Sequence, residues 1–286
     1  MTAITFVGLG AIGFPMASRI SEAGHQVAGV DPLPASRERA AGIGIDAYEH
    51  LSQAPQNKTV VVMVATPAQL KTLVDDALTI GVAGSTWVVM STVGPDSIRE
   101  QGARLVAAGA NLVDSPVTGG VARARTGELN LFTAGDEQVV EGVRAVLEPL
   151  GRINLVGSGL GEGQAIKVIN QHLCSVHIVA AAEALSLAER LGLDREQVLR
   201  LVEAGAAGSW MLSDRGPRML LGPDCEVTST IGIFVKDSGM VVDAGHAVGA
   251  QIPLVEIANQ RYLAAVELGL GQRDDSQVVQ TYRNQG

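Results

Sequence analysis

Residues 8–13 read Gly8-Leu9-Gly10-Ala11-Ile12-Gly13, directly after the apolar run Ile4–Val7 and at the start of a helical pattern over residues 11–23. In this spacing the first glycine allows a tight turn, the second lets the backbone approach a pyrophosphate, and the third lets helix and strand pack closely. The helix N-terminus offers free N–H groups to phosphates. The motif alone is a weak signal, because glycines are common at such turns. It predicts a dinucleotide site formed by Gly8, Gly10, Ala11, Ile12 and Gly13.

A carboxylate follows the loop at the expected distance. Asp31 ends the next apolar run, Gln26–Val30, about twenty residues after the loop. A carboxylate there accepts hydrogen bonds from the adenosine ribose and repels a 2′-phosphate. We expect no arginine beside it, because Arg37 and Arg39 come later, on the next helix. The sequence therefore favours NAD over NADP, with a turn-capping role for Asp31 as the alternative.

The first part of the chain alternates short apolar runs with longer helical patterns, and Pro67 and Pro95 stand where helices are expected to begin. This alternation predicts an α/β fold, a Rossmann-type doubly wound and mainly parallel sheet. Strands are expected at residues 4–7, 26–30, 59–64, 86–90, 111–113, 129–134 and 153–156, and helices at 11–23, 67–78, 95–107 and 137–147.

After Gly163 strand signals become sparse. Residues 164–191 form one long helical pattern, and Asp194 is placed to cap a further helix at 195–204. More helix is expected at residues 231–247 and 254–269. We therefore expect an NAD-binding Rossmann-type domain over residues 1–159. An all-helical domain for substrate binding and oligomerisation should follow over residues 160–286, starting with a long interdomain helix.

Charge and cysteine content restrict the class of protein. A net charge of −9 argues against a role that depends on neutralising nucleic-acid phosphates. Cys174 and Cys225 are far apart and have no metal-ligand spacing, so we expect free thiols in a reducing compartment. No basic leader and no membrane-length apolar run is apparent. The expectation is a cytoplasmic protein with no nucleic-acid, membrane or metal partner.

Three further segments carry a family resemblance. Asp114-Ser115-Pro116-Val117-Thr118-Gly119-Gly120 follows a predicted strand, GEGQAIKVINQ (161–171) opens the long helix, and Phe234-Val235-Lys236-Asp237 lies in the helical part. With the N-terminal loop they resemble the β-hydroxyacid dehydrogenase family, related to 3-hydroxyisobutyrate dehydrogenase, over nearly the whole chain. The resemblance implies an oxidoreductase that acts on small hydroxy acids with a nicotinamide cofactor.

Three polar residues share one face of the long helix. Lys167, Asn170 and Gln171 stand at i, i+3 and i+4. Alcohol oxidation needs the hydroxyl proton to leave as hydride departs, and burial can lower the pKa of a lysine into the required range. The resemblance implies that Lys167 is the catalytic acid/base and that Asn170 orients the substrate. Gln171, where many relatives have a second Asn, is expected to bind substrate. A solvated helix-end lysine is the alternative for Lys167.

A glycine turn offers a second set of substrate contacts. Thr118, Gly119 and Gly120 can bind a carboxylate through successive backbone N–H groups and the Thr hydroxyl. Arg123, where many relatives have Gly, can pair with a carboxylate or with polyol oxygens. An ordinary glycine turn and a solvent-facing arginine are the alternatives.

The remaining expected contacts follow other strand ends. By resemblance, Thr92 reaches the substrate or the nicotinamide. Ala65 and Thr66 follow the preceding strand, where nicotinamide contacts are usual in an open sheet. The resemblance also implies that Lys236 closes the cofactor site, and an ion pair with Asp237 is its alternative.

The segments around Asn170-Gln171, His177, Trp210-Met211 and Arg215 are similar to the L-threonate dehydrogenase branch. That similarity implies NAD-dependent oxidation of a four-carbon sugar acid such as L-threonate at its 2-hydroxyl. The alternatives are a tartronate semialdehyde reductase, a 3-hydroxyisobutyrate dehydrogenase, and a non-catalytic NAD-binding regulatory protein, which Lys167 and Asn170 disfavour. The expected partners are a small anionic hydroxy acid and further copies of the chain, as a homodimer or homotetramer.

Overall fold

The computed structural model describes residues 1–283 and divides into two compact units. The first unit is Met1–Lys167 and the second is Val168–Gly286, so the division falls inside the long helix α7 (Glu162–Arg190). Along residues 1–283, no helix is both long enough and apolar enough to span a bilayer.

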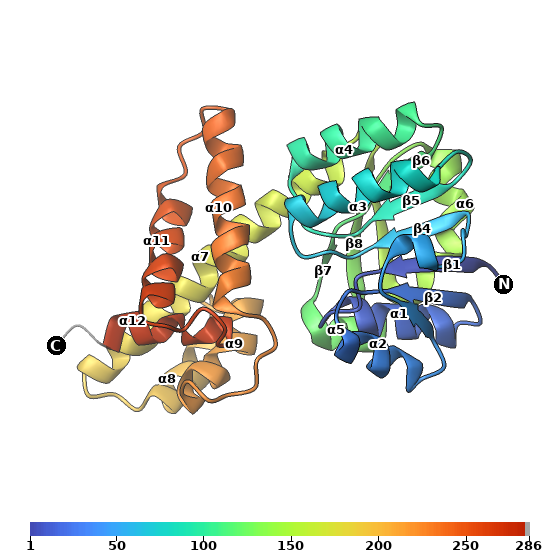
Figure 1. Ribbon diagram of the computed structural model, residues 1–286. Helices are drawn as coiled ribbons and strands as arrows, with labels where there is room; N and C mark the ends of the chain where they lie inside the picture. Colours follow the sequence, from blue (N-terminus) through green and yellow to red (C-terminus); the bar gives the residue numbers. More distant parts are fainter. Residues whose placement is uncertain (284–286) are drawn as a thin grey trace. The chain divides into compact units, whose positions relative to one another are not determined.

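The first unit is built on a nine-stranded sheet with the order β3-β2-β1-β4-β5-β6-β8-β7, in which β9 also pairs with β8 (Figure 1). Neighbouring strands from β3 across to β6 are parallel, whereas β8 runs antiparallel to β6 and β7. The strands are β1 (Ala3–Val7), β2 (Gln26–Val30), β3 (Asp46–Tyr48), β4 (Thr59–Val62), β5 (Thr86–Val89), β6 (Asn111–Asp114), β7 (Val117–Thr118), β8 (Leu129–Ala134) and β9 (Gly151–Gly157).

Both faces of this sheet are buried, because successive side chains on each strand point to opposite sides. On β4, Val61 enters one core and Val62 the other, and Val88 and Val89 do the same on β5. The first core is closed by α1 (Gly13–Glu22), α2 (Pro34–Ala41), α5 (Gly120–Thr126) and α6 (Glu137–Leu147), and the second by α3 (Pro67–Ile80) and α4 (Pro95–Ala107).

The predicted fold class is confirmed, a parallel-sheet Rossmann-type domain followed by a helical region. The strand order changes direction between β1 and β4, and in such sheets ligands bind beyond the carboxyl ends of the strands at that point. Two strands were not expected: β3 and β7 contain only three and two residues, too few to show an alternating pattern.

The second unit is helical. Its core gathers large apolar side chains from several helices, among them Leu185, Met219, Phe234 and Tyr262. Its elements beyond α7 are α8 (Arg195–Glu203), α9 (Trp210–Leu221), α10 (Ile231–Ala247), α11 (Pro253–Glu267), η3 (Asp275–Val279) and α12 (Gln280–Arg283); the first unit also contains η1 (Leu51–Gln53) and η2 (Glu148–Leu150).

A buried ion-pair network joins α9 to η3. Arg215 donates from Nε and Nη2 to the two carboxylate oxygens of Asp275, at 2.9 and 2.8 Å. Arg218 pairs with Asp214 at 2.9 Å and lies 3.2 Å from Asp274. Trp210 stacks on Arg215, with the guanidinium 5.8 Å from the ring centroid. The segment around Arg215 that resembles one branch of the family therefore has a structural role in this unit.

Candidate active site

The glycine loop leaves space for a ligand at one position and none at the others. Gly8 has φ +94°, and a Cβ there would lie 2.2 Å from the carbonyl oxygen of Met63. A Cβ on Gly13 would lie 1.9 Å from the carbonyl oxygen of Gly8. A Cβ on Gly10 would meet nothing within 4 Å. The loop thus packs tightly on the strands and opens outward at Gly10, as backbone approach to a pyrophosphate requires.

Asp31, directly after β2, is hydrogen-bonded to the backbone of this loop. Its carboxylate is 6% exposed, Oδ2 accepts from the Leu9 N–H at 2.8 Å, and Oδ1 accepts from the Leu33 N–H at 2.9 Å. The acid that should select the cofactor therefore also fixes the loop that should hold the pyrophosphate.

The expectation that no arginine adjoins Asp31 is wrong. Arg37 Nη1 donates to the carbonyl oxygens of Asp31 and Pro32, each at 2.8 Å. Arg39 donates to the carbonyl oxygen of Leu9 and stacks 4.6 Å over the Phe14 ring. Because α2 begins at Pro34, one helical turn brings both guanidinium groups back to the strand end. Two cations therefore flank the acid.

Ala65 and Thr66 lie after β4, and Thr66 is the N-cap of α3. The Gln69 side-chain Oε1 accepts from the N–H groups of Ala65 and Thr66 at 2.8 and 3.2 Å, and the Thr66 hydroxyl accepts from the Gln69 N–H at 3.1 Å. This reciprocal arrangement is a capping box. It gives Thr66 a structural function beside the expected cofactor contact, which stays a prediction.

The turn Thr118-Gly119-Gly120 joins β7 to α5 and needs glycine at two positions. Gly119 and Gly120 have φ values of +134° and +68°, and α5 begins at Gly120. A Cβ on Gly119 would lie 2.9 Å from both Cβ and Cδ of Arg123, so the arginine stem packs directly on this turn. The structure therefore brings Arg123 together with the turn that is expected to bind a carboxylate.

Two buried residues that the sequence did not reveal lie next to the expected site. Asp114 ends β6 and Gln164 lies in the first turn of α7, and neither is exposed to solvent. Gln164 Nε2 donates to Asp114 Oδ1 at 3.0 Å and to the Ser91 carbonyl oxygen at 3.0 Å. Burial raises the pKa of Asp114, and hydrogen bonds from Gln164 and from the backbone at Gly161 and Gly163 oppose that rise.

The helix α7 carries the expected acid/base and both amides. Lys167 is 6% exposed. In the second unit Asn170 Nδ2 donates to Gln171 Oε1 at 2.7 Å, and Gln171 Nε2 donates to Asp237 Oδ2 at 2.6 Å. Lys236 Nζ lies 2.8 Å from Asp237 Oδ1. The sequence indicated Asp237 only as an ion-pair partner of Lys236. In the structure it also accepts a hydrogen bond from the side-chain amide of Gln171.

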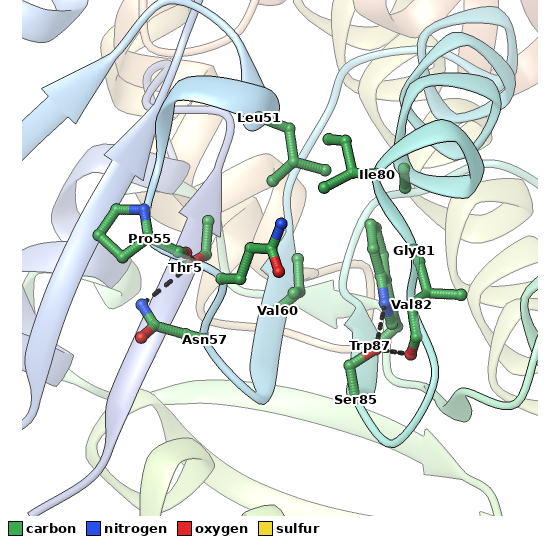
Figure 2. Close-up of a pocket in the computed structure, with 12 residues that line it drawn as sticks. Thr5, Leu51, Pro55, Asn57, Val60, Ile80, Gly81, Val82, Ser85 and Trp87 are labelled. Atoms are coloured by element: carbon green, nitrogen blue, oxygen red, sulfur yellow. Dashed lines mark hydrogen bonds between the residues drawn. The ribbon is translucent and has the colours of Figure 1, made fainter.

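A separate pocket lies toward the amino ends of the parallel strands. Figure 2 shows Leu51, Ile80, Val82 and Trp87 around it, with the Thr5 hydroxyl near Asn57. Most of these residues lie before a strand or near its first residue. The glycine loop lies after the last residue of β1, at the other end of the strands. Several of its polar groups bond within the pocket wall, as in the 3.0 Å bond from the Trp87 indole to Ser85. This pocket is therefore not part of the candidate active site.

Comparisons with known proteins cover both units. A family model described as the NAD binding domain of 6-phosphogluconate dehydrogenase matches residues 3–161. A second, described as NAD-binding of NADP-dependent 3-hydroxyisobutyrate dehydrogenase, matches residues 161–282.

Individual relatives match over nearly the full length. An L-threonate dehydrogenase of Cupriavidus necator is 33% identical over 98% of this chain and 95% of its own. A solved 3-hydroxyisobutyrate dehydrogenase of Salmonella typhimurium is 30% identical with a TM-score of 0.91, covering 98% of this chain and 99% of that one. The 3-hydroxyisobutyrate dehydrogenase of Mycobacterium tuberculosis, solved with L-serine, is 31% identical with a TM-score of 0.86, covering 99% of both chains.

Proposed function

Because this chain belongs to the 3-hydroxyisobutyrate dehydrogenase-related family of β-hydroxyacid dehydrogenases, we propose that it oxidises the 2-hydroxyl of a four-carbon sugar acid such as L-threonate. It is a dehydrogenase with NAD(P)-binding domains. The proposal concerns its substrate, its cofactor preference and the residues that carry the reaction.

One observation carries the proposal: Lys167, Asn170 and Gln171 project from one face of α7, and Asp237 orders the amides. Lys167 Nζ takes the hydroxyl proton during oxidation and returns it during reduction. Asn170 orients the hydroxyl, and Gln171 contacts a further oxygen of the substrate. A bound nicotinamide supplies the acceptor for the hydride. The near-complete burial of Lys167 supports this role, because an amine at this place is shielded from bulk water and can meet a bound hydroxyl directly.

The substrate carboxylate is assigned to the turn at Thr118, Gly119 and Gly120, with Thr92 as a further contact. The glycine turn leads directly into the N-terminus of α5, where backbone N–H groups not used within the helix can bind an anion. Arg123 packs on Gly119 and adds a guanidinium that a branched aliphatic substrate would not need. This additional cation favours a polyhydroxylated acid over 3-hydroxyisobutyrate.

The cofactor is proposed to be NAD. Its pyrophosphate would lie on the loop from Gly8 to Gly13, its ribose on Asp31, and its nicotinamide near Ala65 and Thr66, with Lys236 as an additional contact. The buried Asp31 carboxylate supports NAD because it would repel a 2′-phosphate. Arg37 and Arg39 favour the opposite choice, but both guanidinium groups already bond to backbone carbonyls.

The protein is further proposed to act as a homodimer or homotetramer through its helical unit. Large apolar side chains are exposed on α7 at Ile169, Leu173 and Leu187, and on α11 at Leu254 and Ile257. Ile169 and Leu173 are neighbours on the surface of α7, as are Leu254 and Ile257 on α11, and exposed apolar clusters commonly mark an interface. Size-exclusion chromatography with light scattering tests this assignment, and a monomer at micromolar concentration would contradict it.

The test of function is the rate of NAD reduction with a panel of three- to six-carbon hydroxy acids, repeated with NADP. L-Threonate is expected to give the highest kcat/KM. 3-Hydroxyisobutyrate is the second candidate, because solved relatives of that name share the whole fold. Turnover confined to that compound would replace the proposed substrate.

A further inference from the structure

The side chain of Gln164 uses all of its hydrogen-bonding capacity. Oε1 accepts from the backbone N–H groups of Val93 and Gly94 at 3.0 and 3.1 Å. Nε2 donates to the Ser91 carbonyl oxygen and to Asp114 Oδ1, both at 3.0 Å. A primary amide has two donors and two accepting lone pairs, so this site matches an amide and no other side chain.

Asp114 completes the attachment by capping α7 across a long sequence separation. Its Oδ2 accepts from the backbone N–H groups of Gly161 and Gln164, each at 3.1 Å. A Cβ on Gly163 would lie 2.5 Å from the carbonyl oxygen of Phe132 and 2.8 Å from that of Asp114. The first turn of α7 is therefore pressed against β6 and β8, and glycine at residue 163 is required by the lack of space.

These contacts place Gln164 between two parts of the proposed active site. It holds the backbone on both sides of Thr92, through Ser91 on one side and Val93 and Gly94 on the other. Lys167 follows three residues later on the same helix, so its Cα lies about 4.5 Å further along the axis and on the same side. A displacement of the first turn would move Lys167 with it.

We propose that Gln164 is a positioning residue, which together with Asp114 fixes the α7 turn that carries Lys167 relative to the Thr92 segment. The inference rests on the proposed function, in which Lys167 and Thr92 contact the substrate. Gln164 itself does not act on the substrate. An apolar side chain of the same length would fill the volume but would leave three backbone groups and a buried carboxylate without their partner.

The decisive variant is Gln164→Glu, which preserves shape and removes the two donors. The ionised carboxylate would face Asp114 Oδ1 and the Ser91 carbonyl oxygen, and two carboxylates in one buried site cannot both stay ionised readily. A proton shared by the pair restores a donor toward Asp114 while the other oxygen of the new side chain still accepts from Val93 and Gly94. Charged groups on the same turn and on α4 are unchanged in the variant: Glu162 accepts from the Gly159 N–H, and Arg99 donates to the Leu160 carbonyl oxygen.

The expected result for Gln164→Glu is a lower kcat at high pH that recovers toward the wild-type value at low pH. At about pH 9 the Gln164→Glu enzyme should have a kcat at least about tenfold below wild type, since a displacement of about 1 Å can cost a hundredfold. The ratio of variant to wild-type kcat should rise as the pH falls toward about 5, with KM for the cofactor unchanged. A pH-independent ratio near one would overturn the proposal, because a space-filling residue predicts that outcome.

Two further variants distinguish a specific effect of Gln164→Glu from a general loss of folding. Gln101→Glu alters another buried amide of the same unit, one that bonds to Arg104, and it should show neither the loss nor the acid recovery. The double variant Asp114→Asn with Gln164→Glu exchanges amide and carboxylate, so the amide introduced on β6 can donate to the carboxylate introduced on α7. This exchange should recover a large part of the lost kcat at about pH 9, and a double variant worse than either single variant would overturn the proposal.

Amide hydrogen exchange separates this inference from the proposed function. In Gln164→Glu at high pH, the backbone N–H groups of Val93, Gly94 and residue 164 should lose protection relative to wild type. Unchanged exchange at these positions would overturn the proposal whatever the activity. Failure of every hydroxy acid to turn over with wild type would contradict the proposed function alone, since the exchange experiment would still decide whether Gln164 holds these segments together.

Discussion

Asp237 accepts a hydrogen bond of 2.6 Å from the side-chain amide of Gln171, 66 positions earlier in the chain, and both side chains are more than nine-tenths buried. The bond fixes which end of the Gln171 amide faces which neighbour: Nε2 is directed to Asp237 and Oε1 accepts from Asn170. An amide with a fixed orientation distinguishes donors from acceptors on a substrate, whereas a rotating amide does not.

Replacing Asp237 by Leu should therefore cost more stability than replacing it by Asn. Leu leaves the buried Gln171 amide without its acceptor, which costs about 1–3 kcal/mol of unfolding free energy. Asn keeps an acceptor oxygen and loses only the charge that faces Lys236. Urea denaturation of both variants measures the difference. Equal destabilisation would mean that the Gln171–Asp237 bond contributes nothing beyond the ion pair.

Lys167→Ala should lower kcat at least about a hundredfold and leave NAD binding nearly intact, a typical result of losing an acid/base. Lys167→Arg is the matched control. It keeps the positive charge, but a guanidinium stays protonated and cannot accept the hydroxyl proton. Steady-state kinetics and fluorescence titration with NADH measure the two effects. Wild-type turnover by either variant would contradict the proposed mechanism.

Asp31→Ala should weaken NAD binding more than NADP binding, because the variant removes both a ribose acceptor and the repulsion of a 2′-phosphate. Isothermal titration with each cofactor measures the change. The carboxylate also accepts the Leu9 N–H, so some loss for both cofactors is expected. An equal loss of affinity for NAD and NADP would mean that Asp31 only supports the loop and does not select the cofactor. Arg37→Met then tests whether the neighbouring guanidinium attracts NADP.

Arg123→Gly should lower kcat/KM for L-threonate relative to 3-hydroxyisobutyrate by about tenfold or more, the effect of losing a charged hydrogen bond of about 1.5–3 kcal/mol. Arg125→Gly on the same short helix is the control, since it removes an exposed arginine away from Gly119. An unchanged substrate ratio in Arg123→Gly would show that this arginine does not select the substrate.

Tyr282 provides a test by pH. Burial raises its pKa to about 12, and the Glu183 carboxylate, to which its hydroxyl donates at 3.1 Å, adds to the rise. Because the folded state then holds this proton more tightly than the unfolded state, the contribution of Tyr282 to stability is complete below about pH 10 and is lost as the pH rises through about 12. Tyrosinate absorbance of wild type minus Tyr282→Phe should show this midpoint, and Glu183→Gln should lower it. A midpoint near 10 in wild type would contradict the assignment.

The features that the sequence predicted are those set by local rules. Gly8 and Gly13 occupy positions where a Cβ would collide with backbone atoms. Only glycine fits there, so the sequence motif reports the turn directly. Pro67 and Pro95 begin α3 and α4 as expected, because a first helical residue does not need its N–H. The helix face that carries Lys167 and Asn170 follows from helical geometry alone.

The features that the sequence did not reveal depend on distant partners. Gln164 is one amide in a mostly apolar helix, and its side-chain partners lie 50 to 73 positions away. The approach of Arg37 to the Asp31 carbonyl depends on the direction in which α2 leaves Pro34. The expected contacts of Lys236 and Thr92 with ligands involve molecules outside the chain, and they stay predictions.

The division of the chain directly after Lys167 has a consequence for inheritance within the family. A genetic crossover at that point would transfer Asn170, Gln171 and Asp237 as one linked set, while Lys167 would stay with Asp114 and Gln164. Each set keeps its own buried partners in a chimera. The Asp114–Gln164 pair and the Gln171–Asp237 pair can therefore be inherited separately, even though a single helix carries residues of both.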